Sequence, residues 1–78
     1  MTFTVLQISE VTSDEGAPPI EVRTNVAFAL TFKRAESVAM KLASVQPIHG
    51  PDEKRGGWWA RTEHGMRLRF VVERVDGQ

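Results

Sequence analysis

Alternating hydrophobic and polar positions in residues 56–73 predict a β-hairpin. Two registers are available. A two-residue turn at His64 and Gly65 would place charged side chains among the apolar ones. A three-residue loop over residues 63–65, with Gly65 in the left-handed conformation as a bulge, separates the two classes. We therefore expect the three-residue loop, because a one-residue slip would move every side chain to the opposite face.

In this register the two faces of the hairpin differ in character. One face is mainly apolar and carries Trp58, Ala60, Thr62, Met66, Leu68, Phe70 and Val72. The other face carries Trp59, Arg61, Arg67, Arg69, Val71 and Glu73. We expect the apolar face to line the core and the second face to point outward, with Arg69 as the cross-strand neighbour of Trp59.

Residues 2–11 are rich in β-branched and apolar side chains and predict a strand. Its alternation is imperfect, because Phe3 and Val5 lie on one parity while Leu6 and Ile8 lie on the other. Either a bulge lies near residues 5–6, or both faces of the strand are covered. Residues 12–19 contain Gly, Asp, Ser and two Pro and predict a loop.

Residues 20–33 predict a second strand, since apolar residues or Thr occupy every even position from Ile20 to Phe32. A helix beginning near Val26 is the competing interpretation, but it would leave Val26 and Leu30 on the side away from its apolar stripe. The length of the strand predicts a bend or break near residues 24–25. In this interpretation Ala27 and Ala29 lie on the second, outward face.

Residues 34–45 change to helical spacing. The apolar stripe of this predicted helix consists of Ala35, Val38, Ala39, Leu42 and Val45. No strong N-cap residue precedes a helix that begins at Arg34, and Pro47 ends it. Residues 46–57 then predict a long polar loop, which would be either functional or flexible.

These elements predict an α+β fold in the order β-β-α-β-β, within a single small domain over residues 1–78. Four mainly antiparallel strands would form a sheet, with one helix packed on one face. That face would be lined by the even positions of residues 20–32 and 58–72. The other face would stay in water or meet a partner. Homodimerisation through this face, or by pairing of an edge strand, is a hypothesis that follows.

Composition narrows the functional classes. The chain has no cysteine, so neither disulfides nor thiolate metal sites contribute. Its net charge is zero, but residues 1–22 are acidic and residues 54–74 are largely basic. Such a split indicates a basic binding face, neighbouring strands of opposite charge, or pairing of two copies. No apolar run reaches the roughly 18 residues of a membrane span, and we expect a cytoplasmic protein without membrane partners.

The sequence does not predict catalysis. Its two histidines, His49 and His64, fall in a predicted loop and at a hairpin tip, without a nucleophile-elbow sequence nearby. A metal site of His49, Asp52 and Glu53 would match no established ligand spacing. The glycines match neither dinucleotide- nor phosphate-binding loops. We therefore expect no catalytic residues, no metal ligands and no cofactor.

Binding is the better-supported class. Trp59 lies beside Arg61, Arg67 and Arg69 on the outward face of the hairpin, and Trp and Arg are enriched in protein–protein hot spots. We expect a small non-enzymatic module that binds a protein partner or a second copy of itself. The alternatives are a nucleic-acid interface that stacks bases on Trp59, and a plain solvated face held by cation–π contacts. Zero net charge counts against nucleic acid.

In size and layout, but without a diagnostic motif, the chain resembles very small α+β proteins of bacterial mobile elements and phages. These include some anti-CRISPR inhibitors. The resemblance implies a further alternative, an inhibitor that acts by occluding a larger machine.

Overall fold

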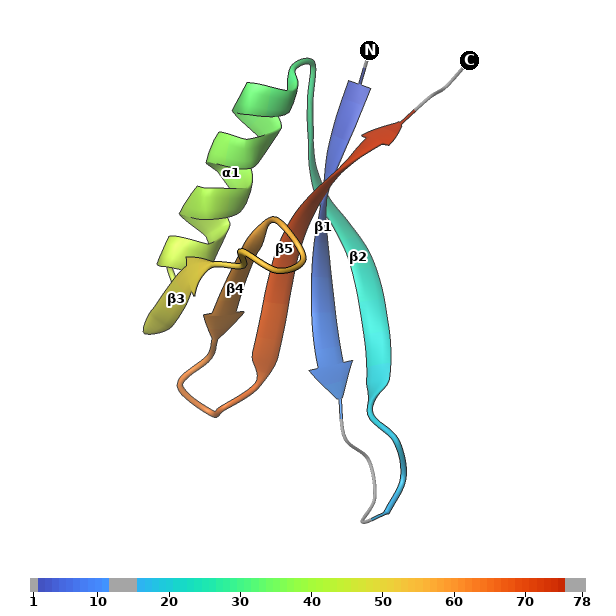
Figure 1. The fold of residues 1–78 in the computed structure, drawn as a ribbon, viewed down its shortest axis with the longest axis vertical. Coiled ribbons are helices and arrows are strands. Elements are labelled where there is room, and N and C mark those ends of the chain that lie inside the picture. Colours follow the sequence, from blue (N-terminus) through green and yellow to red (C-terminus); the bar gives the residue numbers. More distant parts are fainter. Residues whose placement is uncertain (1, 12–15, 76–78) are drawn as a thin grey trace.

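The computed structural model describes residues 2–11 and 16–75, which form five strands and one helix (Figure 1). In chain order these are β1 (Thr2–Val11), β2 (Ile20–Ala29), α1 (Phe32–Ser44), β3 (Ile48–Pro51), β4 (Trp58–Arg61) and β5 (Arg67–Val75). The strands form one antiparallel sheet in the order β2-β1-β5-β4-β3. The helix packs on one face of this sheet. The predicted α+β class, antiparallel sheet and single packed helix are confirmed within the described residues.

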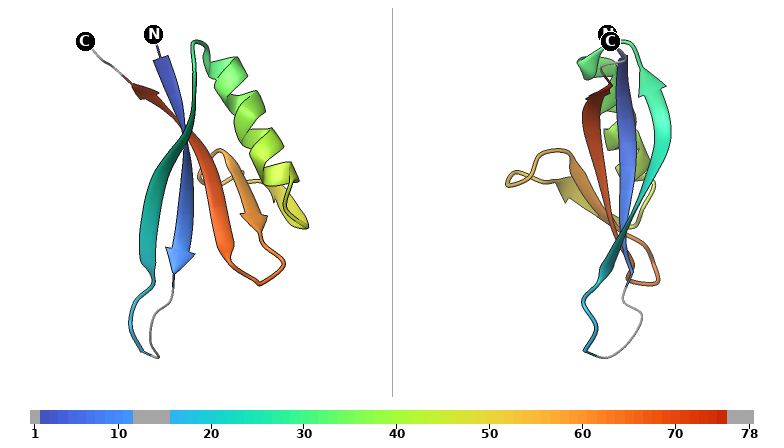
Figure 2. Two further views of the ribbon diagram at one scale, coloured as in Figure 1. Left: turned by 180° about the vertical axis from the view of Figure 1, so that it is seen from behind. Right: turned by 90° about the vertical axis from the view of Figure 1, so that its right-hand side faces the viewer.

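The prediction of four strands is wrong, because β3 forms inside the segment predicted as a loop. It pairs with β4, and His49 lies opposite Ala60. This short strand carries a glycine and ends in Pro51, so its sequence shows no alternation that would reveal it. A proline is tolerated there because β3 is an edge strand. The connection between β3 and β4 therefore shrinks to residues 52–57, and it projects away from the sheet (Figure 2).

The predicted hairpin is confirmed in its register. The Thr62 N–H donates to the Met66 carbonyl at 3.0 Å, which closes a loop over residues 63–65. Gly65 has a φ of 86°, the left-handed conformation that the predicted bulge requires. Trp58 lies opposite Phe70, and Trp59 lies opposite Arg69, as predicted.

The second strand ends earlier than predicted. It stops at Ala29, and α1 begins at Phe32 instead of Arg34. The Thr31 side-chain oxygen accepts a hydrogen bond from the Arg34 N–H at 3.2 Å. Thr31 is therefore a favourable N-cap, and the prediction of a helix without one is wrong because its start was placed two residues too late.

A bulge in β2 reverses the predicted faces of its second half. Val5 lies opposite Ala27 but Leu6 lies opposite Asn25, so Val26 is an extra residue in β2. Beyond the bulge Ala27 and Ala29 face α1, while Phe28 is 65% exposed. The prediction that Ala27 and Ala29 point outward is therefore wrong. β1 itself has no bulge, because it pairs with β5 in one continuous register, and the register shift beside Val5 and Leu6 comes from the extra residue in β2. Val5 on one face of β1 and Leu6 and Ile8 on the other are buried, which agrees with the alternative that both faces of this strand are covered.

The core lies between α1 and the sheet. Its buried members are Val5, Ala29, Ala35, Ala39, Ala43, Ala60, Leu68 and Phe70. Alanines along α1 allow the helix to approach the sheet closely. The predicted stripe holds for Ala35 and Ala39, which are buried, and for Val38 and Leu42, which are partly buried. Val45 follows the end of the helix and is exposed, and Ala43 is buried at that end of the helix.

Candidate binding surface on the outer sheet face

The four predicted site residues come together on the outer face, which is the face of the sheet opposite α1. Trp59 and Arg61 lie on β4, directly opposite Arg69 and Arg67 on β5. All four line a hollow of about 380 Å³. Because the hairpin register aligns these residues in pairs, two adjacent strands are enough to bring them together.

Three of the four arginines that line this hollow have no anionic partner among the described residues. Arg61 lies directly opposite Arg67, and like charges in that position destabilise a sheet. Within the part of the chain that the structure describes, Arg61, Arg67 and Arg69 form no ion pair. The guanidinium groups of these three arginines are therefore not held in ion pairs within the described residues.

Arg69 has the most constrained environment of the three. On the outer face it lies between Ile8 of β1 and Trp59 of β4. Its Nε is buried and has no hydrogen-bond partner among the described residues. A buried donor without an acceptor costs on the order of 1–3 kcal/mol, so an acceptor supplied to this hollow would recover part of that cost.

Trp59 packs against β3. A β-carbon added at Gly50 would lie 3.1 Å from both Cζ2 and Nε1 of the indole. The indole therefore lies over the Gly50 backbone, which explains why this short strand has a glycine opposite a tryptophan. Trp59 is half-buried as a result, and β3 supports one wall of the hollow.

Acidic residues that the sequence reasoning did not assign to the site form the other side of the hollow. Glu10 on β1 and Glu21 on β2 lie opposite one another, and Glu10 also lies opposite Arg67. A row across four strands thus reads Glu21, Glu10, Arg67, Arg61, with two negative positions followed by two positive ones. The acidic segment at 1–22 and the basic segment at 54–74 were the available signal, but only the strand order shows that they meet.

The loop over residues 52–57 completes the rim. The Asp52 carboxylate accepts a hydrogen bond from the Arg55 N–H at 3.2 Å and lies 3.6 Å from the Arg55 Nε. The Asp52 carbonyl also accepts from the Gly56 N–H at 2.8 Å. These contacts fix a tight turn that brings Asp52 and Arg55 to the hollow, where both line its wall.

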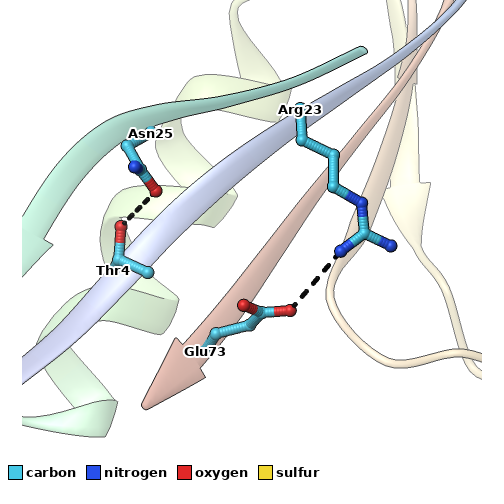
Figure 3. Close-up of polar contacts among 4 residues, drawn as sticks. All are labelled: Thr4, Arg23, Asn25 and Glu73. Atoms are coloured by element: carbon cyan, nitrogen blue, oxygen red, sulfur yellow. Dashed lines mark hydrogen bonds and ion pairs between the residues drawn. The ribbon is translucent and has the colours of Figure 1, made fainter. Parts of the chain in front are cut away.

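Two apolar side chains on the outer face are buried without help from the helix. Leu6 is 8% exposed and Ile8 is 5% exposed. An ion pair of 3.9 Å joins Arg23 on β2 to Glu73 on β5 and spans the intervening strand β1 (Figure 3). Beside it, the Thr4 hydroxyl donates to the Asn25 side-chain oxygen at 3.0 Å. Long polar side chains therefore cover the outer face at β1. The arginines and Trp59 of the hollow lie to one side of this region, on β4 and β5.

Other chemistry finds little support in the described residues. His49 lies on exposed β3, where its Nδ1 is 3.2 Å from the Gln46 carbonyl oxygen, and His64 is exposed in the hairpin loop. In the described segments, no group of three or more His, Asp or Glu side chains is arranged to hold a metal ion. No helix of these segments is long and apolar enough to cross a membrane.

Comparisons with known proteins identify no relative of this chain. No protein-family model matches it. No curated protein and no solved structure matches it either.

Proposed function

We propose that the chain is a small, non-enzymatic protein-binding module that docks an acidic segment of its partner on the outer sheet face. The observation that carries this proposal is the hollow itself. Three arginines without an anionic partner in the described chain surround a half-buried tryptophan there.

Carboxylates are the ligands that this arrangement fits. The planar guanidinium of arginine binds a carboxylate through two parallel hydrogen bonds. A carboxylate between Arg61 and Arg67 would turn their repulsion into attraction, and a further acceptor would meet the unpartnered Nε of Arg69. Trp59 adds a rigid aromatic contact, and tryptophan and arginine together dominate protein–protein hot spots.

The acidic side of the hollow favours a protein over a nucleic acid. A phosphate backbone that reached the arginines would also approach Glu10 and Glu21. Nucleic-acid affinity rests largely on phosphate neutralisation, which a chain of zero net charge supports weakly. A short polypeptide can place its carboxylates at the arginines without extending to the glutamates. The nucleic-acid alternative therefore ranks second.

Fluorescence of Trp59 tests the proposal. Replacement of Trp58 by Phe leaves Trp59 as the single tryptophan, and we expect its emission to change on titration with a short peptide of alternating Glu and Gly. In the same background Arg67→Ala should weaken binding at least about tenfold, because it removes one of the paired guanidinium groups. Arg34→Ala, on the exposed surface of α1, is the matched control and should leave binding unchanged.

A short oligothymidylate added at the same salt concentrations separates the alternatives. Oligonucleotide binding in the absence of peptide binding would replace the proposal with the nucleic-acid function. A Trp59 signal unchanged by either ligand would contradict both.

A further inference from the structure

The β2 edge of the sheet is open to pairing. The strand order leaves β2 and β3 at the two edges of the described sheet. β3 has four residues and ends in a proline, whereas β2 has ten residues, of which the first seven are exposed. A long edge strand presents a row of unpaired N–H and C=O groups to another chain.

This edge also carries apolar side chains. Ile20 is 56% exposed and Val22 is 47% exposed. They lie on the α1 side of the sheet, but on the part of the β1–β2 pair that runs away from the helix (Figure 1). The helix therefore does not cover them. On the outer side of the same stretch, Glu21 and Arg23 alternate with them.

We propose that two copies of the chain pair through β2 as antiparallel strands, around a two-fold axis that is perpendicular to the sheet and lies midway between the two copies of Val22. In this arrangement Val22 lies opposite Val22 of the second copy. Glu21 of each copy lies opposite Arg23 of the other. The two sheets join into one continuous sheet with both helices on the same face.

The charges on β2 select this register. A perpendicular two-fold axis keeps every side chain on its own face and places two copies of the same residue opposite one another at the centre of the pair. Centring the pair on Glu21 would place two glutamates opposite one another, and centring it on Arg23 would place two arginines opposite one another. Only centring on Val22 pairs opposite charges, which stabilise adjacent strands where like charges destabilise them.

Both ends of the paired stretch are defined. Pro19 precedes β2 and has no N–H to donate, and the bulge at Val26 interrupts the ladder on the other side. Arg23 can leave its ion pair with Glu73 and contact Glu21 of the second copy instead. The pair with Glu73 is weak, because it is 3.9 Å long and both side chains are more than half exposed. A stretch limited to residues 20–24 is short, so the dimer should depend on protein concentration.

Single-cysteine variants test the register, since the natural chain contains no cysteine. Opposed residues of antiparallel strands have Cα atoms about 4.5–5.5 Å apart, which is within the range of a disulfide. Val22→Cys should therefore form a covalent dimer under mild oxidation. In Thr24→Cys the two thiols are offset by four positions, roughly 13 Å, and should form at least about tenfold less dimer in the same time. Circular dichroism of both variants checks that the fold is kept.

Charge exchange gives an independent readout of the same pairing. In sedimentation velocity of the cysteine-free chain, Glu21→Arg and Arg23→Glu should each lower the dimer fraction, and the double variant should restore it. Equal crosslinking of the two cysteine variants, or a double variant no more dimeric than the single ones, would overturn the proposal. Glu21 also lines the hollow, but the arginines and Trp59 that carry the proposed function lie on β4 and β5, away from this edge. Failure here would therefore leave the proposed function of the hollow intact.

Discussion

At Gly57 the chain turns back onto β5, and this one residue fixes the loop that forms the rim of the hollow. Its φ is 81°, and its carbonyl accepts a hydrogen bond from the Asp52 N–H at 3.0 Å. A β-carbon at position 57 would overlap the Phe70 carbonyl oxygen. Gly56 has nearly the same φ, 80°, but open space around it. Substitutions at these two adjacent glycines therefore distinguish the cost of the left-handed backbone conformation from the cost of a close contact.

Substitution of these glycines should have unequal effects. Gly56→Ala introduces a side chain in the left-handed conformation and should lower the free energy of unfolding by about 1 kcal/mol. Gly57→Ala adds an overlap with β5 and should cost at least about 2 kcal/mol. Urea denaturation measures both. Equal losses would show that the loop does not pack on β5.

At the scale of elements, the sequence predicts best where short-range geometry decides. The hairpin of β4 and β5 follows from Gly65 and the alternation around it, and the Trp59–Arg69 pair follows from the hairpin. The length of residues 20–32 predicts a break near residues 24–25, but their unbroken alternation does not indicate that the bulge at Val26 adds a residue to the strand. One extra residue exchanges the two faces of the strand beyond it, so the faces predicted for Ala27 and Ala29 are wrong.

The helix start shows the same limit. Phe32 continues the even-position pattern of the strand, so alternation places it in the strand, although Thr31 is a good N-cap. The turn that separates strand from helix involves only residues 30–31. Strand alternation, with a period of two residues, and helical spacing, with a period of 3.6, both fit such a stretch. The N-cap is the feature that decides where the helix begins.

Removal of this cap should be measurable. Thr31→Ala deletes the oxygen that accepts from the Arg34 N–H and should lower the free energy of unfolding by about 1 kcal/mol. Ser37→Ala, at an exposed position inside α1, is the control and should be neutral or slightly stabilising, because alanine has the higher helix propensity. Chemical denaturation followed by circular dichroism compares them. Similar results for both variants would remove Thr31 as the cap.

At the scale of the whole molecule, the strand order creates the hollow. Pairing of β1 with β5 joins the acidic N-terminal hairpin to the basic C-terminal one, and the charges meet between Glu10 and Arg67. The arginines and Trp59 could be predicted as a group because they share one hairpin. Glu10, Glu21 and the 52–57 loop could not, since no local spacing reports which strands become neighbours.

The proposed function requires that an acidic segment of a partner binds in the hollow. Nuclear magnetic resonance of the ¹⁵N-labelled natural chain, titrated with the Glu–Gly peptide, tests it most directly. We predict the largest shift changes at the indole N–H of Trp59 and the amides of Arg61 and Arg67, with little change along α1. Changes centred on α1, or none at peptide concentrations in the millimolar range, would contradict the assignment of the outer face as the binding surface.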